Sequence, residues 1–207
     1  MGEERLIKRG AEAEILLSEW MGRKAILKRR TPKSYRLRII DERLRGTRTK
    51  EEAKLLLDAR KAGVRVPLIY DVDLRKGQIT MEKIEGKRIK DILDGLKSSE
   101  REEVCRHLGR GIARLHRANI IHGDITTSNL FLSNNSIVWI DFGLGEKSEE
   151  IEQKAVDLHV LMEVFESTHH KCKECFSWVV EEYGKEYKDA KRVTKRMENL
   201  IKRGRYK

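Results

Sequence analysis

The sequence lacks the long apolar runs that would hold it in a bilayer. No stretch approaches the ~18 apolar residues that a membrane-spanning helix takes, and the charged start MGEERLIKRG has no apolar centre of the kind found in a secretory signal. Cysteine is scarce: the three are Cys105, Cys172 and Cys175, which fits a reducing compartment. The segment HHKCKEC at 169–175 offers metal ligands, but no second cysteine pair completes a closed zinc site. These absences predict a cytoplasmic protein without a membrane partner.

Positive charge is abundant and unevenly distributed. The 207 residues include 45 Lys or Arg against 34 Asp or Glu, a net charge of +11, which indicates a soluble protein with acidic partners. Residues 23–50 hold twelve basic and two acidic residues, and residues 188–207 hold nine and two. Each run could be a solvated helix face, and nucleic acid is the leading alternative.

The first part of the chain has the pattern of a small sheet with one helix. Three short β-prone runs, separated by small or charged residues, predict antiparallel strands at 5–8, 14–19 and 24–29. A helix is expected over about 49–61 with Gly63 as its stop, and Val66-Pro67 opens a strand pair that turns at Lys76-Gly77.

Beyond Gly86 the pattern is helical. Val104, Leu108, Ile112 and Leu115 recur every three or four residues, and Ser99 with Glu102 predicts a capping box at the start of that helix. Two or three further helical segments follow Gly143. We therefore expect an α+β fold of two lobes with a hinge near Glu85-Gly86, namely residues 1–84 and 85–207.

The most informative stretch is IHGDITTSN at 121–129, followed by an apolar run that ends in Asp141-Phe142-Gly143. An Asp, an Asn five residues later and a DFG triplet form the arrangement with which protein kinases bind magnesium ATP. Asp124 would face the attacking hydroxyl or water, while Asn129 and Asp141 would supply oxygen ligands to Mg²⁺. Either piece alone could be an ordinary turn, but their order and spacing together favour the site.

A lysine for the phosphates is expected on the third strand. Lys28 lies in AILKRR, where it could also be one of several surface cations. Its partner would be Glu52, which shares a helical face with Ala53 and Leu56. Thr49 and Glu52 also match a capping box, which would instead fold Glu52 back onto its own helix.

The nucleotide base is expected against the segment MEKIEG that joins the lobes. Backbone groups of Glu82 and Ile84 would bond the adenine edge, and Met81 would set the depth of the pocket. The phosphate-covering loop is reduced, because Gly10 is followed by Ala11-Glu12-Ala13 where a full loop has three glycines. This predicts a looser cover over the ATP phosphates.

These residues resemble the PRPK family, the small atypical serine/threonine kinase subunit of the KEOPS complex. The resemblance spans nearly the whole chain and rests on HGDITTSN, DFG, the short length and the basic tail IKRGRYK. It implies a bilobal kinase-like fold that uses ATP and Mg²⁺ and supports threonylcarbamoyl modification of transfer RNA. The implied partners are the other KEOPS subunits, especially the tRNA threonylcarbamoyltransferase subunit, and tRNA itself.

The departures from ordinary protein kinases agree with one another. Gly123 stands where an arginine normally pairs with a phosphorylated activation loop, only thirteen residues separate Gly143 from Asp157, and no APE motif follows. Thr126 replaces a lysine that contacts the γ-phosphate in many kinases. Asp157 in KAVDLHVL resembles the aspartate that braces the catalytic loop, although it could be a solvent-facing helix acid.

These departures predict an enzyme that activation-loop phosphorylation does not switch and that phosphorylates free peptides poorly. Two other functions stay open. One is a free-standing serine/threonine protein kinase that acts on protein substrates, and the other is a noncatalytic RNA-binding scaffold. The basic tail could contact RNA or fold back toward its own cleft.

Overall fold

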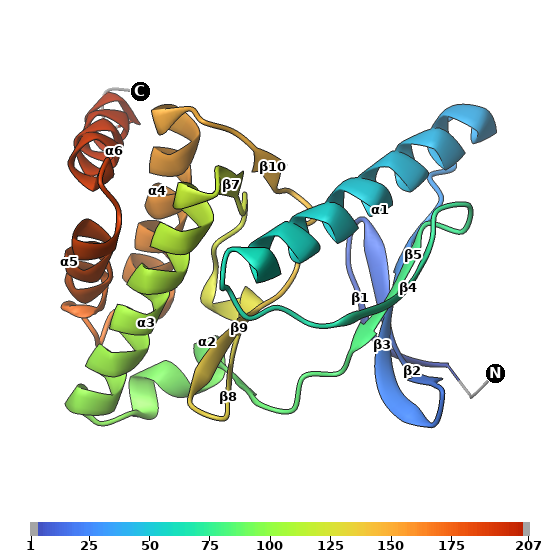
Figure 1. Ribbon diagram of the computed structural model, residues 1–207, viewed down its shortest axis with the longest axis horizontal. Helices are drawn as coiled ribbons and strands as arrows, with labels where there is room; N and C mark the ends of the chain where they lie inside the picture. Colours follow the sequence, from blue (N-terminus) through green and yellow to red (C-terminus); the bar gives the residue numbers. More distant parts are fainter. Residues whose placement is uncertain (1–3, 205–207) are drawn as a thin grey trace. The chain divides into compact units, whose positions relative to one another are not determined.

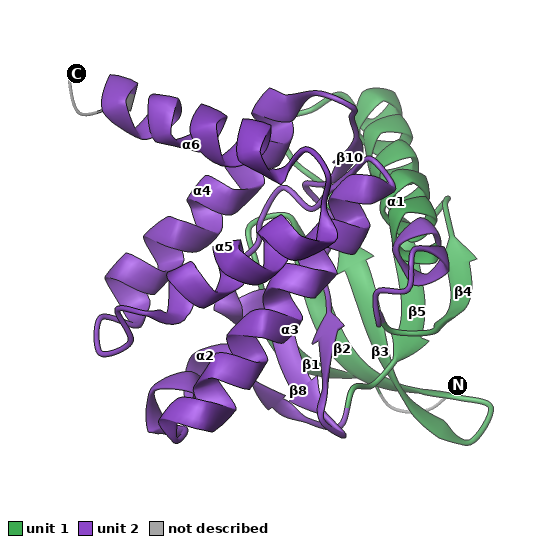
Figure 2. Cartoon of the chain, turned by 60° about the vertical axis from the view of Figure 1, so that its left-hand side comes forward, with its two compact units in different colours: residues 1–57, 67–84 green, residues 58–66, 85–207 purple. Residues whose placement is uncertain are grey.

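The computed structural model describes residues 4–204, and the chain divides into two compact units (Figure 2). Unit 1 comprises residues 1–57 and 67–84, and unit 2 comprises residues 58–66 and 85–207. Residues 58–66 comprise the last turn of the helix expected in the first lobe and the segment that follows it. They cluster with unit 2, where the backbone N–H of Trp139 donates to the Arg65 carbonyl at 2.8 Å and the Arg114 side chain donates to the Gly63 carbonyl at 2.7 Å. No helix among residues 4–204 has both the length and the apolar character to cross a bilayer.

Unit 1 is an antiparallel sheet in the order β1-β2-β3-β5-β4 together with one long helix (Figure 1). Its elements are β1 (Arg5–Arg9), β2 (Ala13–Trp20), β3 (Arg23–Arg30), α1 (Arg38–Lys61), β4 (Ile69–Asp73) and β5 (Gln78–Glu82). Met21 and Gly22 both have positive φ, as a two-residue hairpin loop between right-twisted strands requires. All five predicted strands are therefore present.

The helix of unit 1 packs on this sheet through a small apolar core. Ala53 contacts Ile79 and Met81, and partly buried side chains from β3 and β4 complete the cluster. The helix begins eleven residues before the predicted Thr49. Its first turns show no apolar stripe, but Arg45 and Asp41 form an i,i+4 ion pair at 2.7 Å that supports a polar helix.

Unit 2 is mainly helical. Its helices are α2 (Ile89–Ile92), α3 (Ser98–Arg117), α4 (Ile151–Thr168), α5 (Cys175–Glu186) and α6 (Ala190–Gly204), with 3₁₀ turns η1 (Leu93–Gly95) and η2 (Thr127–Asn129). Its strands are β6 (Lys87–Arg88), β7 (Ile120–Ile121), β8 (Leu130–Ser133), β9 (Ser136–Trp139) and β10 (Glu146–Lys147). Helix α3 packs on α5 and α4 packs on α6, while β6-β8-β9 and β10-β7 form two small sheets.

The predicted apolar positions of α3 form its core face. Leu108, Ile112 and Leu115 are fully buried. The predicted capping box is wrong in register. The helix begins at Ser98, and Glu100 rather than Glu102 accepts a bond from the N-cap Lys97 N–H at 3.0 Å. Glu102 instead bonds Arg106 one turn later.

Candidate active site

The Asp124 loop lies between two short strands of unit 2. Strand β7 ends at Ile121, and η2 carries the chain from Thr127 to Asn129 at the start of β8. The Asn129 Nδ2 donates to the Asp124 carbonyl at 3.0 Å and to the Asp124 carboxylate at 2.8 Å. Because both acceptors are oxygens, the amide nitrogen of Asn129 faces Asp124 and its Oδ1 is turned away. The loop therefore fixes both side chains at once.

A buried carboxylate from α4 holds this loop. Asp157 is 1% exposed, and its two oxygens accept the backbone N–H groups of His122 and Gly123, each at 2.8 Å. The His116 Nε2 lies 3.5 Å from the same carboxylate. The brace predicted for Asp157 is confirmed, and the alternative of a solvent-facing acid is wrong.

Gly123 is required by its backbone and its surroundings. Its φ is +80°, and a Cβ added there would lie 2.2 Å from the Leu144 carbonyl oxygen. A side chain such as arginine would therefore collide with the segment after the DFG triplet. That segment pairs as β10 with β7, with Glu146 opposite Ile121, and leads directly into α4. The short link expected between DFG and Asp157 is thus a β-paired connection.

His122 joins the Asp124 loop to the DFG segment. Its Nδ1 accepts the Asp124 N–H at 3.3 Å, and its Nε2 lies 3.2 Å from the Ile140 carbonyl, so the neutral Nε2–H tautomer fits both bonds. Burial lowers the pKa of His122, which agrees with a neutral ring. The ring also lies 4.4 Å from that of Phe142.

Asp141 follows in a strained position directly beside this network. The Ile140 N–H donates to the Asn129 carbonyl at 3.0 Å, which places the backbones of Asn129 and of the DFG triplet side by side. Asp141 itself has φ +64°, a conformation that non-glycine residues adopt rarely. Its Oδ1 accepts the Gly143 N–H at 3.3 Å.

A histidine that the sequence suggested only as a metal ligand supports the loop from the C-terminal end of α4. His169 is 1% exposed; its Nε2 lies 2.9 Å from the Thr127 hydroxyl, and its Nδ1 lies 2.9 Å from the Asp94 carboxylate. Cys172 and Cys175 in the next turn are joined as a disulfide, which differs from the reduced thiols that the sequence suggested. Residues 4–204 contain no cluster of three or more His, Cys, Asp or Glu suited to a metal.

In unit 1, Glu52 lies between two cations. Its Oε1 accepts the Lys28 ammonium at 2.5 Å and its Oε2 accepts the Arg30 guanidinium at 2.7 Å, with all three side chains less than a tenth exposed. The predicted Lys28–Glu52 ion pair is present, and the alternative capping box is absent. Thr49 lies within α1, where its hydroxyl donates to the Arg45 carbonyl at 2.7 Å.

The reduced glycine loop is tied down by charges that sequence reasoning missed. Glu12 accepts the Arg48 guanidinium at 2.6 Å and lies 3.5 Å from Arg30. The hydrogen bond from Arg48 lowers the pKa of Glu12. The Gly10 N–H donates to the Ala13 carbonyl at 2.8 Å and closes the turn. Ion pairs thus hold the Gly10–Ala13 loop, which was expected to cover the phosphates more loosely because it has one glycine in place of three.

The residues proposed for the nucleotide base lie at the end of β5. Met81 is 8% exposed and pairs with Ile26 of β3. The Glu82 N–H donates to the Leu68 carbonyl at 2.8 Å, so the carbonyl of Glu82 is the group that could accept a bond from a purine amino group. Ile84 is the last residue of unit 1.

The basic tail is an amphipathic helix over the range that the structure describes. Val193 and Met197 on α6 are buried, and Arg196 pairs with Glu152 of α4. The last three residues of the predicted tail, 205–207, lie outside the described residues. The structure therefore shows one face of α6 against α4.

Comparison with known proteins agrees with this geometry. A family model described as "ABC1 atypical kinase-like domain" matches residues 43–176. The chain is 47% identical over 173 residues to the KEOPS complex subunit Bud32 of Pyrococcus abyssi, covering 81% of this chain and 79% of that protein. It is 37% identical over 209 residues to the EKC/KEOPS complex subunit bud32 of Dictyostelium discoideum, covering 98% and 83%.

A longer relative also matches. The chain is 42% identical over 205 residues to a probable bifunctional tRNA threonylcarbamoyladenosine biosynthesis protein of Methanobrevibacter smithii, but it spans only 37% of that protein. The antiparallel sheet with one helix, the Asp124 loop and the DFG segment define an atypical kinase-like domain. Within that class the chain belongs to the Bud32 family, also called PRPK, as the HGDITTSN motif indicated.

Proposed function

We propose that this chain is an ATP-dependent atypical kinase or ATPase that works as a KEOPS subunit and supports threonylcarbamoyladenosine modification of tRNA. The observation that carries the catalytic part is the locked pair of Asp124 and Asn129, held by the Asp157 brace. The assembly part rests on the names of the Bud32 relatives and of the bifunctional relative. The proposed partners are the other KEOPS subunits, especially the threonylcarbamoyltransferase subunit, and tRNA.

The residues of unit 2 fit a magnesium nucleotide. Mg²⁺ prefers oxygen ligands and usually takes one or two carboxylates together with substrate phosphates and water. The Oδ1 of Asn129, turned away from Asp124, and the carboxylate of Asp141 are donors of that kind. Bound magnesium ATP would supply the γ-phosphoryl group and neutralise charge that develops as it is transferred.

The chain's own residues would then carry distinct tasks. Asp124 orients the attacking water or hydroxyl and accepts its proton, while the Asn129 amide keeps the carboxylate in one position. Lys28, steadied by Glu52, contacts the phosphates. Within unit 1, the base would meet Glu82 and Ile84 beside Met81, and the phosphates would pass Gly10.

Turnover of ATP by the purified chain tests the catalytic assignment. Asp124→Ala should lower magnesium-dependent hydrolysis by about 10²–10⁴-fold, the usual contribution of a positioned acid or base, with little change in nucleotide affinity. Asp71→Asn, on the exposed side of β4, is the matched control and should retain activity. Unchanged hydrolysis in Asp124→Ala would remove the assignment.

A free-standing serine/threonine protein kinase is the second candidate, because the same site could transfer phosphate to a protein hydroxyl. The β-paired link at Glu146–Lys147 argues against it, since this link occupies the place where an ordinary kinase has the segment that docks peptides. Labelled ATP separates the two: inorganic phosphate that rises with tRNA and the other KEOPS subunits supports our proposal. Label on a protein hydroxyl without those partners supports the alternative.

A further inference from the structure

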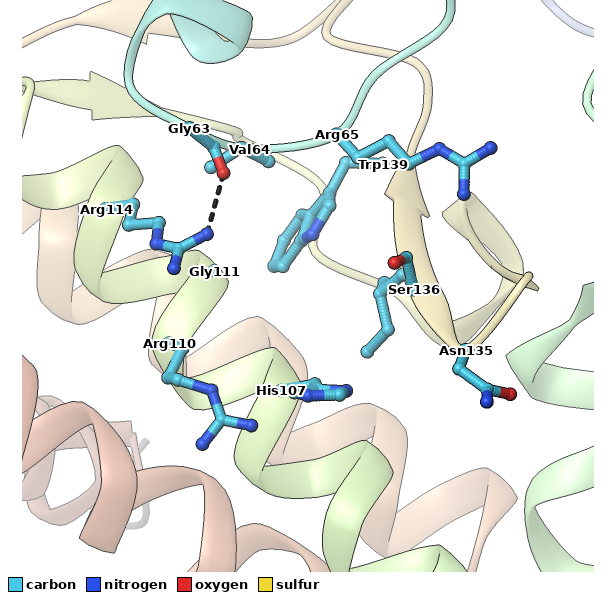
Figure 3. A pocket seen from close by; sticks show the side chains of 11 residues that line it. Gly63, Val64, Arg65, His107, Arg110, Gly111, Arg114, Asn135, Ser136 and Trp139 are labelled. Carbon is cyan, nitrogen blue, oxygen red and sulfur yellow. Dashed lines mark hydrogen bonds between the residues drawn. The ribbon is translucent and has the colours of Figure 1, made fainter.

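Unit 2 contains a cavity of about 280 Å³ that lies apart from the motif residues (Figure 3). Its walls are the loop after α1 (63–65), one face of α3 and the β8–β9 hairpin with Trp139. This volume is near the lower end of the ~300–1,000 Å³ typical of small-molecule sites. It suits one compact group rather than a whole nucleotide.

Three arginines are among the residues that line the cavity. They are Arg65, Arg110 and Arg114, and no Asp or Glu is among the lining residues. Arg110 and Arg114 are four residues apart on α3, so they project from the same helical face. We call this cavity the arginine cavity, and its lining residues carry a net positive charge.

Two of these charges are oriented without being neutralised. The Arg114 Nη1 donates to the Gly63 carbonyl at 2.7 Å, as Figure 3 shows, and the Arg65 Nη1 donates to the Ser133 carbonyl at 2.9 Å. A carbonyl carries no formal charge, and each guanidinium has five N–H donors, so donors and charge remain for a ligand. Arg110 differs, because it bonds the Glu182 carboxylate at 2.6 Å.

His107 reports the local field. Burial lowers the pKa of His107 first, and the nearby Arg110 and Arg114 lower it further, against the opposing influence of Glu103 and Glu182. The ring is therefore neutral at neutral pH and can donate or accept a hydrogen bond. An anion in the cavity would offset the arginines and raise this pKa.

One wall of the cavity is rigid because of a glycine. A Cβ at Gly111 would lie 2.5 Å from the Trp139 ring, so only glycine lets the indole pack against α3. Trp139 is 2% exposed, and Figure 3 shows its indole between the 63–65 loop and Gly111. The Trp139 side of the arginine cavity is thus formed by a closely packed contact.

We propose that the arginine cavity binds a phosphate group of an RNA strand, an inference that rests on the tRNA-associated function proposed above. Arginine forks match phosphate oxygens in a bidentate manner, and phosphate contacts of this kind position a nucleic acid without reading its sequence. The net charge of +11 favours a polyanion over an isolated anion. Asn135 and Ser136 at the hairpin add polar groups for the adjoining sugar.

Binding of a fluorescently labelled single-stranded RNA oligonucleotide to the full chain tests this proposal. The variant Arg65→Gln/Arg114→Gln should weaken binding by about tenfold or more, since bonds to charged groups are worth ~1.5–3 kcal/mol each. The slope of log affinity against log salt should flatten by about 0.7 for the lost phosphate. The control Arg75→Gln/Lys90→Gln removes the same charge from exposed positions outside the cavity and should change the affinity much less.

Two further measurements do not use the arginine variant, so they test the proposal even if that variant fails to fold. In the Trp20→Phe/Trp178→Phe chain, Trp139 is the only tryptophan, and its fluorescence should change when the oligonucleotide binds. In the unmodified chain, NMR titration should show the His107 pKa rise with the oligonucleotide.

The outcomes are distinct. Equal weakening in the cavity variant and the control, or silent Trp139 and His107 signals on RNA binding, would overturn the proposal. Signals given by a phosphoserine peptide but not by RNA would also overturn it and indicate a protein partner. Signals given by inorganic phosphate but not by RNA would overturn it as well and indicate a small-anion site. ATP turnover, measured in parallel, should stay unchanged in the cavity variant. Failure of the cavity is thereby separated from failure of the catalytic proposal.

Discussion

Replacing the brace aspartate by asparagine should damage both stability and turnover. Each Asp157 oxygen accepts one loop N–H at 2.8 Å, but asparagine has only one acceptor oxygen. The amide nitrogen must then face the second N–H. The variant loses one charge-assisted bond, worth about 1.5–3 kcal/mol, and leaves a buried N–H unpaired, at about 1–3 kcal/mol.

Together these losses amount to about 2.5–6 kcal/mol of unfolding free energy. Domains are stable by only ~5–15 kcal/mol, so the variant should fold but melt on the order of 10 °C lower. The released loop would also misplace Asp124. Because a displacement of about 1 Å can cost ~10²-fold in rate, kcat should fall by about that factor while the KM for ATP changes little.

The assay combines thermal unfolding followed by circular dichroism with ATP turnover measured below the melting point of the variant. Glu166→Gln, an exposed acid on the same helix, makes the same chemical change without the brace and should match the unmodified chain. Melting within about 2 °C of the unmodified chain together with full turnover for Asp157→Asn would refute the reasoning.

Three further predictions follow from the same contacts. Burial lowers the pKa of His116 and of His122 below 6.5, so the unfolded chain binds more protons than the folded chain below about pH 6.5. Urea unfolding should therefore show the free energy of unfolding fall as the pH is lowered, by up to ~1.4 kcal/mol per pH unit for each ring. A free energy of unfolding that does not change with pH would contradict this. Ser148 is the only hydroxyl residue between Gly143 and Asp157, and Ser148→Glu should not raise turnover, whereas a large activation would contradict the absence of a phosphorylation switch. His169→Asn should raise the Mg²⁺ concentration needed for half-maximal turnover by several-fold at nearly unchanged nucleotide affinity, because His169 orients Thr127 in the turn before Asn129; an unchanged Mg²⁺ profile would show that the histidine only fills space.

The sequence predicted those parts of the site that are contiguous in the chain. HGDITTSN and DFG place Asp124 and Asn129 on one loop, which the structure shows locked together. The Asp157 brace was predicted as well, because KAVDLHVL resembles the segment whose aspartate supports the catalytic loop of kinases. Strand positions in unit 1 followed from alternation and turn residues.

Contacts between distant segments could not be predicted in the same way. His169 meets Asp94 across 75 residues, and Arg48 meets Glu12 across 36, with no periodic signal to join them. The start of α1 was missed because a polar helix held by ion pairs such as Asp41–Arg45 has no apolar stripe to detect. Single charged residues reveal their partners only when the fold is known.

The two cations on Glu52 have a consequence for how a nucleotide could enter and leave. A buried carboxylate that loses its only cation is left with a large desolvation penalty. Here the Lys28 ammonium bonds one oxygen of Glu52 and the Arg30 guanidinium bonds the other, so Glu52 would keep one cation if Lys28 turned toward a phosphate as proposed. In the proposed mechanism, Arg30 would therefore reduce the desolvation penalty on Glu52 each time Lys28 moved to the substrate.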